Sequence, residues 1–87
     1  MNPREELQWF SQKMERELRE NDHKGGWQGC SDWFLFQRLL EEAGELAAVL
    51  SGAREGNAIS EAADIANFAM MIADNIRRAS MLTGNLE

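Results

Sequence analysis

Cysteine, proline and histidine each occur only once in this sequence of 87 residues. With Cys30 alone, the chain cannot form an internal disulfide and has no second cysteine for a zinc knuckle, which fits a reducing compartment. With His23 alone, the chain has no pair of Glu-x-x-His motifs. A di-iron carboxylate bundle, which needs such pairs on facing helices, is therefore excluded.

Long apolar runs and clusters of basic residues are also absent. No run approaches the roughly 18–20 residues that cross a bilayer, and the N-terminus begins with charge instead of the apolar core of a signal peptide. We therefore expect a cytoplasmic protein with no membrane partner. The net charge of −6 argues against binding a nucleic acid polymer through its backbone, although a polyanion could still bind through metal ions.

The composition is that of one small soluble domain, residues 1–87, with 44% hydrophobic and 28% charged residues. A chain of this length buries only about 60–65% of its unfolded surface. Oligomerisation would therefore help to stabilise it.

The spacing of apolar residues predicts helices throughout, so the expected fold class is all-α. Capping residues and apolar spacing place the helices at 3 to about 20 with Asn2 as N-cap, at about 32 to 50 with Ser31 as N-cap, and from a cap at Asn57 or Ser60 to about 79. The short link between the second and third helices predicts an antiparallel hairpin.

The third helix is apolar nearly all round at Ala69-Met70-Met71-Ile72-Ala73, which is typical of a helix buried on more than one side. One chain of three helices does not provide that burial, so we expect a four-helix-bundle-like assembly completed by oligomerisation. The tail from 80 to 87 adds Met81, Leu82 and Leu86, enough for a further half-turn or a partner contact.

Carboxylates interrupt the second helix at Glu41, Glu42 and Glu45. Because each helical residue turns by about 100°, Glu42 and Glu45 share a face and Glu41 lies one step outside it. Glu42 borders the apolar stripe, where an unpaired charge is costly. The alternative interpretation of this group is a solvated acidic stripe.

A second acidic pair, Glu61 and Asp64, has the same spacing on the third helix, and the side chain of Glu61 falls on the apolar face. Like charges that face each other would destabilise the helix pair unless divalent cations neutralise them, and oxygen ligands suit Mg²⁺. These residues therefore predict a carboxylate-lined magnesium site. For Glu61 alone, the alternative is an acid stabilised by the dipole of its helix.

A glycine-rich loop with the sequence Lys24-Gly25-Gly26-Trp27 precedes the second helix. Together with Glu41-Glu42-x-x-Glu45, a gap of 15 residues, and Glu61-x-x-Asp64, this loop resembles the signature of the MazG-like family of all-α nucleoside triphosphate pyrophosphohydrolases. The resemblance extends from about Asp22 to Asn75.

This resemblance implies Mg²⁺-dependent hydrolysis of (deoxy)nucleoside triphosphates to the monophosphate and pyrophosphate, in the house-cleaning of nucleotide pools. It implies Glu42, Glu45, Glu61 and Asp64 as metal ligands. Glu41 would then support a ligand or orient the attacking water, so that Glu41 and Glu42 are the candidate catalytic residues. It also implies a homodimer or tetramer in which helices of one protomer complete the pocket of another.

Substrate contacts are expected from the loop and from two helical residues. Lys24 could neutralise phosphate charge, and Trp27 could either stack on a base or act as a hydrophobic plug. Arg38, one turn before Glu41 and Glu42, either reaches a phosphate or pairs with Glu42 or Glu45. Asn75 lies on the same stripe as Asp64 and could bind sugar, base or phosphate.

Asn67 is predicted to point further outward than Asn75 and is a weaker candidate for ligand binding.

The sequence leaves two questions open, namely which nucleotide base is preferred and which class of protein this is. No set of residues maps to one base. The alternatives to an enzyme are a catalytically silent nucleotide- or metal-binding module and a helical oligomerisation module.

Overall fold

The computed structural model describes residues 1–83 and, within them, side chains as far as Leu82. The elements are α1 (Glu5–Asn21), a short 3-10 turn (Asp22–Lys24), α2 (Asp32–Leu50) and α3 (Ala58–Thr83). No strand occurs in this part of the chain, which confirms the all-α prediction. Leu86, predicted to contribute to a tail contact, lies outside the described residues.

The predicted caps of α2 and α3 are confirmed, whereas that of α1 is wrong. Ser31 accepts a hydrogen bond from the backbone N–H of Phe34 at 3.1 Å, and the side chain of Asn57 accepts bonds from the first N–H groups of α3. The first helix begins at Glu5 and not at Pro3, because Arg4 is still extended, with φ −62° and ψ 156°. Acidic residues in the first turn of α1 complement its dipole in place of a side-chain cap.

The third helix is longer than the sequence predicted. It continues past Ala79 to Thr83, because the residues from 76 to 82 are mostly good helix formers and the next glycine is Gly84. None of the helices described is long and apolar enough to cross a membrane.

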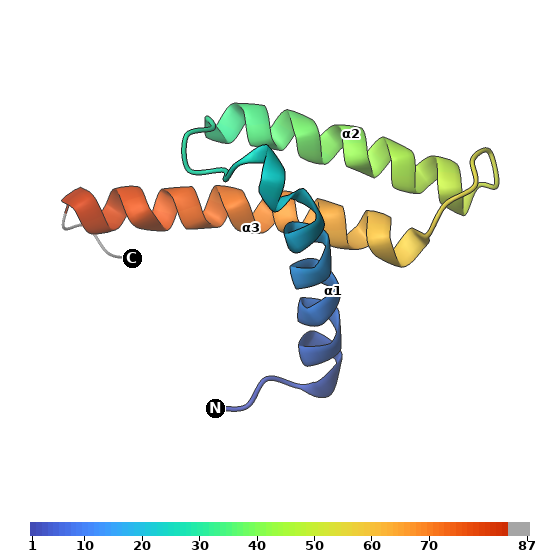
Figure 1. Ribbon diagram of the computed structural model, residues 1–87, viewed down its shortest axis with the longest axis horizontal. Coiled ribbons are helices and arrows are strands. Elements are labelled where there is room, and N and C mark those ends of the chain that lie inside the picture. Colours follow the sequence, from blue (N-terminus) through green and yellow to red (C-terminus); the bar gives the residue numbers. More distant parts are fainter. Residues whose placement is uncertain (84–87) are drawn as a thin grey trace.

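Helices α2 and α3 lie side by side and antiparallel, as predicted, and α1 stands at a steep angle to them with its C-terminal end against α3 (Figure 1). The link from α2 to α3 turns at Gly52, whose φ of 81° lies in the left-handed region that favours glycine. This turn brings the residues that follow α2 back towards the start of α3.

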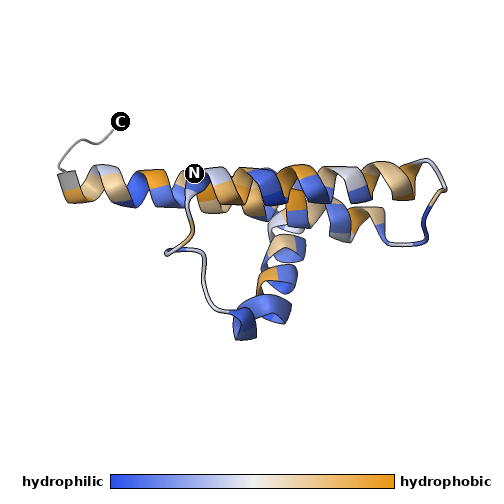
Figure 2. Cartoon of the chain, turned by 90° about the horizontal axis from the view of Figure 1, so that it is seen from above, coloured by the Kyte–Doolittle hydropathy of each residue, from blue (hydrophilic) through white to orange (hydrophobic). Residues whose placement is uncertain are grey.

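The interior of the single chain is small and unusually polar. Among the described residues, the buried hydrophobic side chains are Leu35 and Ala63, and the buried polar ones are Glu42, Glu61 and Asn67. Hydrophobic residues recur along the whole of α3, including the end that extends past α2 (Figures 1 and 2). Several large ones on both long helices are exposed, among them Trp33, Leu40, Leu50, Ile76 and Met81.

Candidate functional site

A pocket of about 620 Å³ lies where the three helices and the glycine-rich loop meet. This volume falls within the range of about 300–1,000 Å³ that is usual for small-molecule sites. One part of its wall consists of carboxylates from all three helices, and another consists of apolar groups such as Leu35, Phe68 and Met71. The pocket therefore has a charged part and an apolar part.

The carboxylates of Glu42, Glu45 and Glu61 converge from α2 and α3. One oxygen atom of each lies within 4.8 Å of the others, and Glu42 and Glu61 are each only 9% exposed. The inward orientation expected for these two acids is therefore confirmed. Asp64 lines the same pocket one turn further along α3 but is not part of this close group. We refer to Glu42, Glu45 and Glu61 as the carboxylate triad.

Glu41 takes a different position from the triad. Its side chain is 61% exposed and pairs with Arg38, and it is not among the residues that line the pocket. Arg38 itself lines the pocket, lies 3.4 Å from Glu42 Oε1, and has its guanidinium carbon 5.4 Å from the centre of the Phe68 ring. Of the two roles considered for Arg38, pairing with the acids is the one seen here.

Arg54, which the sequence analysis did not single out, approaches the triad from the α2–α3 link. Its guanidinium nitrogens lie 3.5 Å from Glu45 Oε1 and 3.8 Å from Glu61 Oε1. The only sequence signal was a lone basic residue between two acidic pairs, close to a glycine that could reverse the chain. The other oxygen of Glu61, Oε2, is buried without a hydrogen-bond partner.

The crowding of acids raises the proton affinity of the site. Burial, a hydrogen bond with Glu45 and the charges of Glu45 and Asp64 raise the pKa of Glu42 to about 7, against the opposing effect of Arg38. The pKa of Glu45 is lowered, first because it accepts this hydrogen bond from Glu42. The two side chains therefore share a proton near neutral pH.

A further acid comes from α1. Glu17 lines the pocket, and its pKa is raised by burial and then by the charges of neighbouring acids, including Glu61. Burial followed by the charges of Glu17, Glu61, Glu45 and Glu20 raises the pKa of Asp64 to about 6. Glu17 could not be singled out from the sequence, because its place in the pocket depends on how α1 crosses α3.

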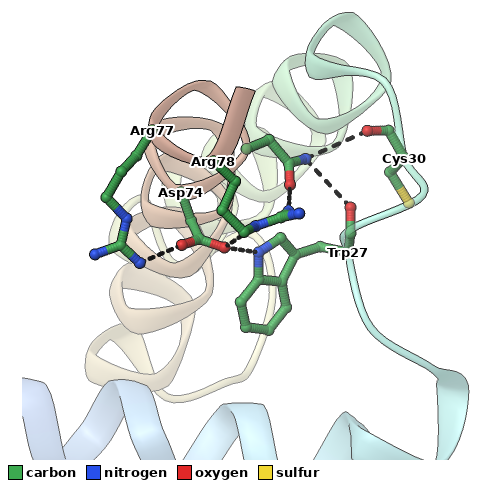
Figure 3. Close-up of polar contacts among 6 residues, drawn as sticks. Trp27, Cys30, Asp74, Arg77 and Arg78 are labelled. Atoms are coloured by element: carbon green, nitrogen blue, oxygen red, sulfur yellow. Dashed lines mark hydrogen bonds and ion pairs between the residues drawn. The ribbon is translucent and has the colours of Figure 1, made fainter. Parts of the chain in front are cut away.

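Two other predicted site residues, Lys24 and Trp27, line the pocket from the loop. Lys24 is exposed and has no ion-pair partner within residues 1–83. The indole N–H of Trp27 donates a hydrogen bond to Asp74 Oδ2 at 3.0 Å, which fixes the ring against α3 (Figure 3).

Asn75 and Asp74 hold this loop on α3. The side-chain amide of Asn75 donates to the backbone carbonyls of Trp27 at 3.2 Å and Cys30 at 3.3 Å. Hydrogen bonds from Arg77, Trp27 and Arg78 lower the pKa of Asp74 to about 2 (Figure 3). Asn75 is not among the residues that line the pocket, and its side-chain amide supports the loop from α3.

The outward orientation predicted for Asn67 is wrong. Its side chain is buried, with 3% of the residue exposed, because α1 covers this face of α3. A helical wheel drawn for α3 alone cannot show that another helix covers this face. Its Nδ2 donates a hydrogen bond to the backbone carbonyl of Met14 on α1 at 2.9 Å. Its Oδ1 is buried without a partner, and the residue lines the pocket.

Comparison of the chain with models of known families, with curated proteins and with solved structures finds no match in any of the three.

The bonds around Asp74 predict that the loop depends on this side chain. Asp74→Ala removes the acceptor for Trp27, Arg77 and Arg78, so we expect the melting temperature to fall by several degrees. The fluorescence of Trp27 should shift to longer wavelength in a Trp9→Phe, Trp33→Phe background as the indole becomes more exposed. Glu55→Ala, at an exposed acid of the α2–α3 link, is the control. Equal melting temperatures for the two variants would contradict the assignment.

Proposed function

We propose that the chain binds Mg²⁺ at the carboxylate triad and hydrolyses nucleoside triphosphates to the monophosphate and pyrophosphate. The observation that carries this proposal is the convergence of three carboxylates from two helices within 4.8 Å, with one buried Glu61 oxygen left without a partner. The resemblance of the acid pattern and loop to the MazG-like family supports the same activity, with Asp64 as a further ligand.

The triad fits a magnesium ion by its chemistry. All of its donors are oxygen atoms, which hard cations such as Mg²⁺ prefer. Burial, and then the proximity of Glu45 and Asp64, raises the pKa of Glu42, so the site favours added positive charge. Bound Mg²⁺ would supply that charge, allow an acidic pocket to accept a triphosphate, and lower the pKa of a coordinated water.

The remaining pocket residues suit a nucleotide. Lys24 and Arg38 present positive charge to phosphates, while Trp27, Phe68 and Met71 offer apolar contacts to a base. In the metal-free protein the pKa values of Glu42 and Asp64 are raised to about 7 and about 6, and a bound cation would lower both again. Glu41 pairs with Arg38 and is not among the pocket residues, so we infer that its role is to hold Arg38.

We also propose that the chain assembles as a homodimer or tetramer that completes a helical bundle. In support, the rings of Trp33 and Phe36 are in a tilted contact with their centres 5.6 Å apart and remain exposed. The protruding end of α3 also carries exposed hydrophobic residues. Light scattering coupled to gel filtration should give a mass at least twice that of one 9.9-kDa chain. A monomer at micromolar concentration would contradict this proposal.

Pyrophosphate release from a panel of ordinary and damaged nucleoside triphosphates, with and without Mg²⁺, tests the activity. Monophosphate and pyrophosphate formed only with metal would support the proposal and rank the substrates. Mg²⁺-dependent nucleotide binding without release would instead indicate a catalytically silent binding module. The absence of any stabilisation by Mg²⁺ would favour an oligomerisation module.

Arg54 predicts a measurable competition with the metal. Its guanidinium contacts two of the three triad carboxylates, so Arg54→Gln should increase the affinity for Mg²⁺ in the absence of nucleotide. Ion pairs at a protein surface contribute about 0.2–1 kcal/mol, so we expect an increase of about 1.4- to fivefold in isothermal titration calorimetry. Arg16→Gln, which removes an exposed pair with Glu20 on α1, is the matched control. Weaker Mg²⁺ binding by Arg54→Gln would contradict the prediction.

A further inference from the structure

The side-chain amide of Asn67 has only one orientation available to it. Its neighbour on α1 is the backbone carbonyl of Met14, 2.9 Å from Nδ2. A carbonyl can only accept hydrogen bonds, so rotating the amide by 180° would place two oxygen atoms in contact. The amide nitrogen therefore faces α1, and the acceptor oxygen, Oδ1, does not take part in this contact.

This acceptor is buried and has no hydrogen-bond partner within the described residues. Buried carbonyl oxygens are nearly always paired in folded proteins, because an unpaired one has lost its hydration without compensation. Asn67 is 3% exposed and lines the pocket. An unpaired acceptor in this position is explained if a group that enters the pocket provides the missing donor.

The position of Asn67 along α3 indicates which part of a nucleotide it meets. With a rise of 1.5 Å per residue, Asn67 lies about 9 Å along the helix axis from Glu61, and Met71 lies about 15 Å from Glu61. Asn67 thus lies between the carboxylate triad and the apolar part of the pocket, formed by Phe68, Met71 and Trp27. A triphosphate at the carboxylates would bring the nucleoside next to Asn67.

We propose that Asn67 Oδ1 accepts a hydrogen bond from the nucleoside part of the ligand and is a specificity-determining residue of this chain. This inference rests on the proposed nucleotide function. The donor is an O–H of the sugar or an N–H of the base, and both offer the same chemistry to the carbonyl oxygen. Because Oδ1 can only accept hydrogen bonds, a nucleoside that presents only acceptors to it is disfavoured.

Binding of nucleotide analogues that resist cleavage tests the inference without depending on turnover. Calorimetry with Mg²⁺ would compare α,β-methylene triphosphates in pairs that differ by one donor: adenosine with purine riboside, cytidine with pyrimidin-2-one riboside, ribose with 2′-deoxyribose, and 2′-deoxyribose with 2′,3′-dideoxyribose. The wild-type protein should bind one member of at least one pair about 10- to 100-fold more tightly, the range for pairing a buried polar group. The pair that is discriminated identifies the sugar or the base as the source of the donor.

The same pairs measured with Asn67→Leu should show no such difference, because the acceptor has been removed. Asn67→Ala is a second variant in case the larger side chain prevents folding, and an unchanged Mg²⁺ affinity confirms that the site is intact. If wild type and variants discriminated every pair equally, the inference would be wrong, and Oδ1 would be satisfied by water or by another chain. If no analogue bound to the wild type at all, the proposed nucleotide function itself would fail.

Discussion

Glu61→Gln is expected to reduce Mg²⁺-dependent pyrophosphate release by about 100- to 1,000-fold, the range seen when one preorganised charge-stabilising group is removed. The two side chains have nearly the same shape, but glutamine offers one neutral oxygen in place of a charged carboxylate. Glu61 also has a buried oxygen atom, Oε2, that no protein group pairs with. The substitution therefore removes the triad oxygen that is most in need of a metal ion. Steady-state assays of pyrophosphate release, combined with Mg²⁺ titration, measure both consequences.

Stability separates a metal-site effect from misfolding. Glu61 faces Glu45 and Asp64, so removing its charge relieves repulsion in the metal-free protein. The melting temperature of Glu61→Gln without Mg²⁺ should equal or exceed that of the wild type, whereas added Mg²⁺ should stabilise only the wild type. Glu41→Gln is the control, since Glu41 is exposed and outside the pocket, and its activity should fall far less. Wild-type turnover by Glu61→Gln would overturn the metal assignment.

The helices and the inward carboxylates could be predicted because both depend on local periodicity. The caps at Ser31 and Asn57 and the burial of Glu42 and Glu61 follow from spacing on one helix at a time. Such spacing says which face of a helix is apolar and which charges interrupt that face. It does not say which other elements cover the face.

The contacts that the sequence did not predict all depend on the arrangement of elements that are distant in the chain. Asn67 is buried only because α1 crosses α3 at Met14. Arg54 reaches the triad only because the chain reverses at Gly52. Asn75 supports the loop because residues 27 and 30 fold back onto α3. None of these three arrangements leaves a periodic signal in the sequence.

Buried acids and exposed hydrophobic residues each carry a cost in the single chain. The interior contains Glu42, Glu61 and Asn67. Each has a buried polar or charged group whose lost hydration is not fully compensated within the chain, which costs free energy of folding. The surface carries apolar side chains that would be more stable if covered. A cation, a nucleotide and a second copy of the chain would each offset one of these costs, which is why ligand binding and stability should be coupled in this protein.

The pH dependence of stability should reveal this coupling. The pKa values of Glu42 and Asp64 are raised to about 7 and about 6, so the folded state binds protons more tightly than the unfolded state. Their contribution to stability is therefore fully present below the ordinary carboxyl pKa of about 4 and is lost as pH rises through 6 and 7. Asp74, with its pKa lowered to about 2, stays ionised in both states above pH 5 and does not change this trend.

The metal-free protein is accordingly expected to melt at a lower temperature at pH 8 than at pH 5.5, measured by circular dichroism. Mg²⁺ should reverse this order, because it binds the ionised carboxylates and must displace the proton shared by Glu42 and Glu45. Displacing one proton weakens the apparent Mg²⁺ affinity about tenfold for each pH unit below about 7. Glu42→Gln has no such proton to displace, so its residual Mg²⁺ binding should be nearly independent of pH between about 7 and 8 and should weaken only towards pH 6, where Asp64 takes up a proton. An equally steep dependence in that variant would show that the titrating group is not Glu42 and would move the assignment to Asp64.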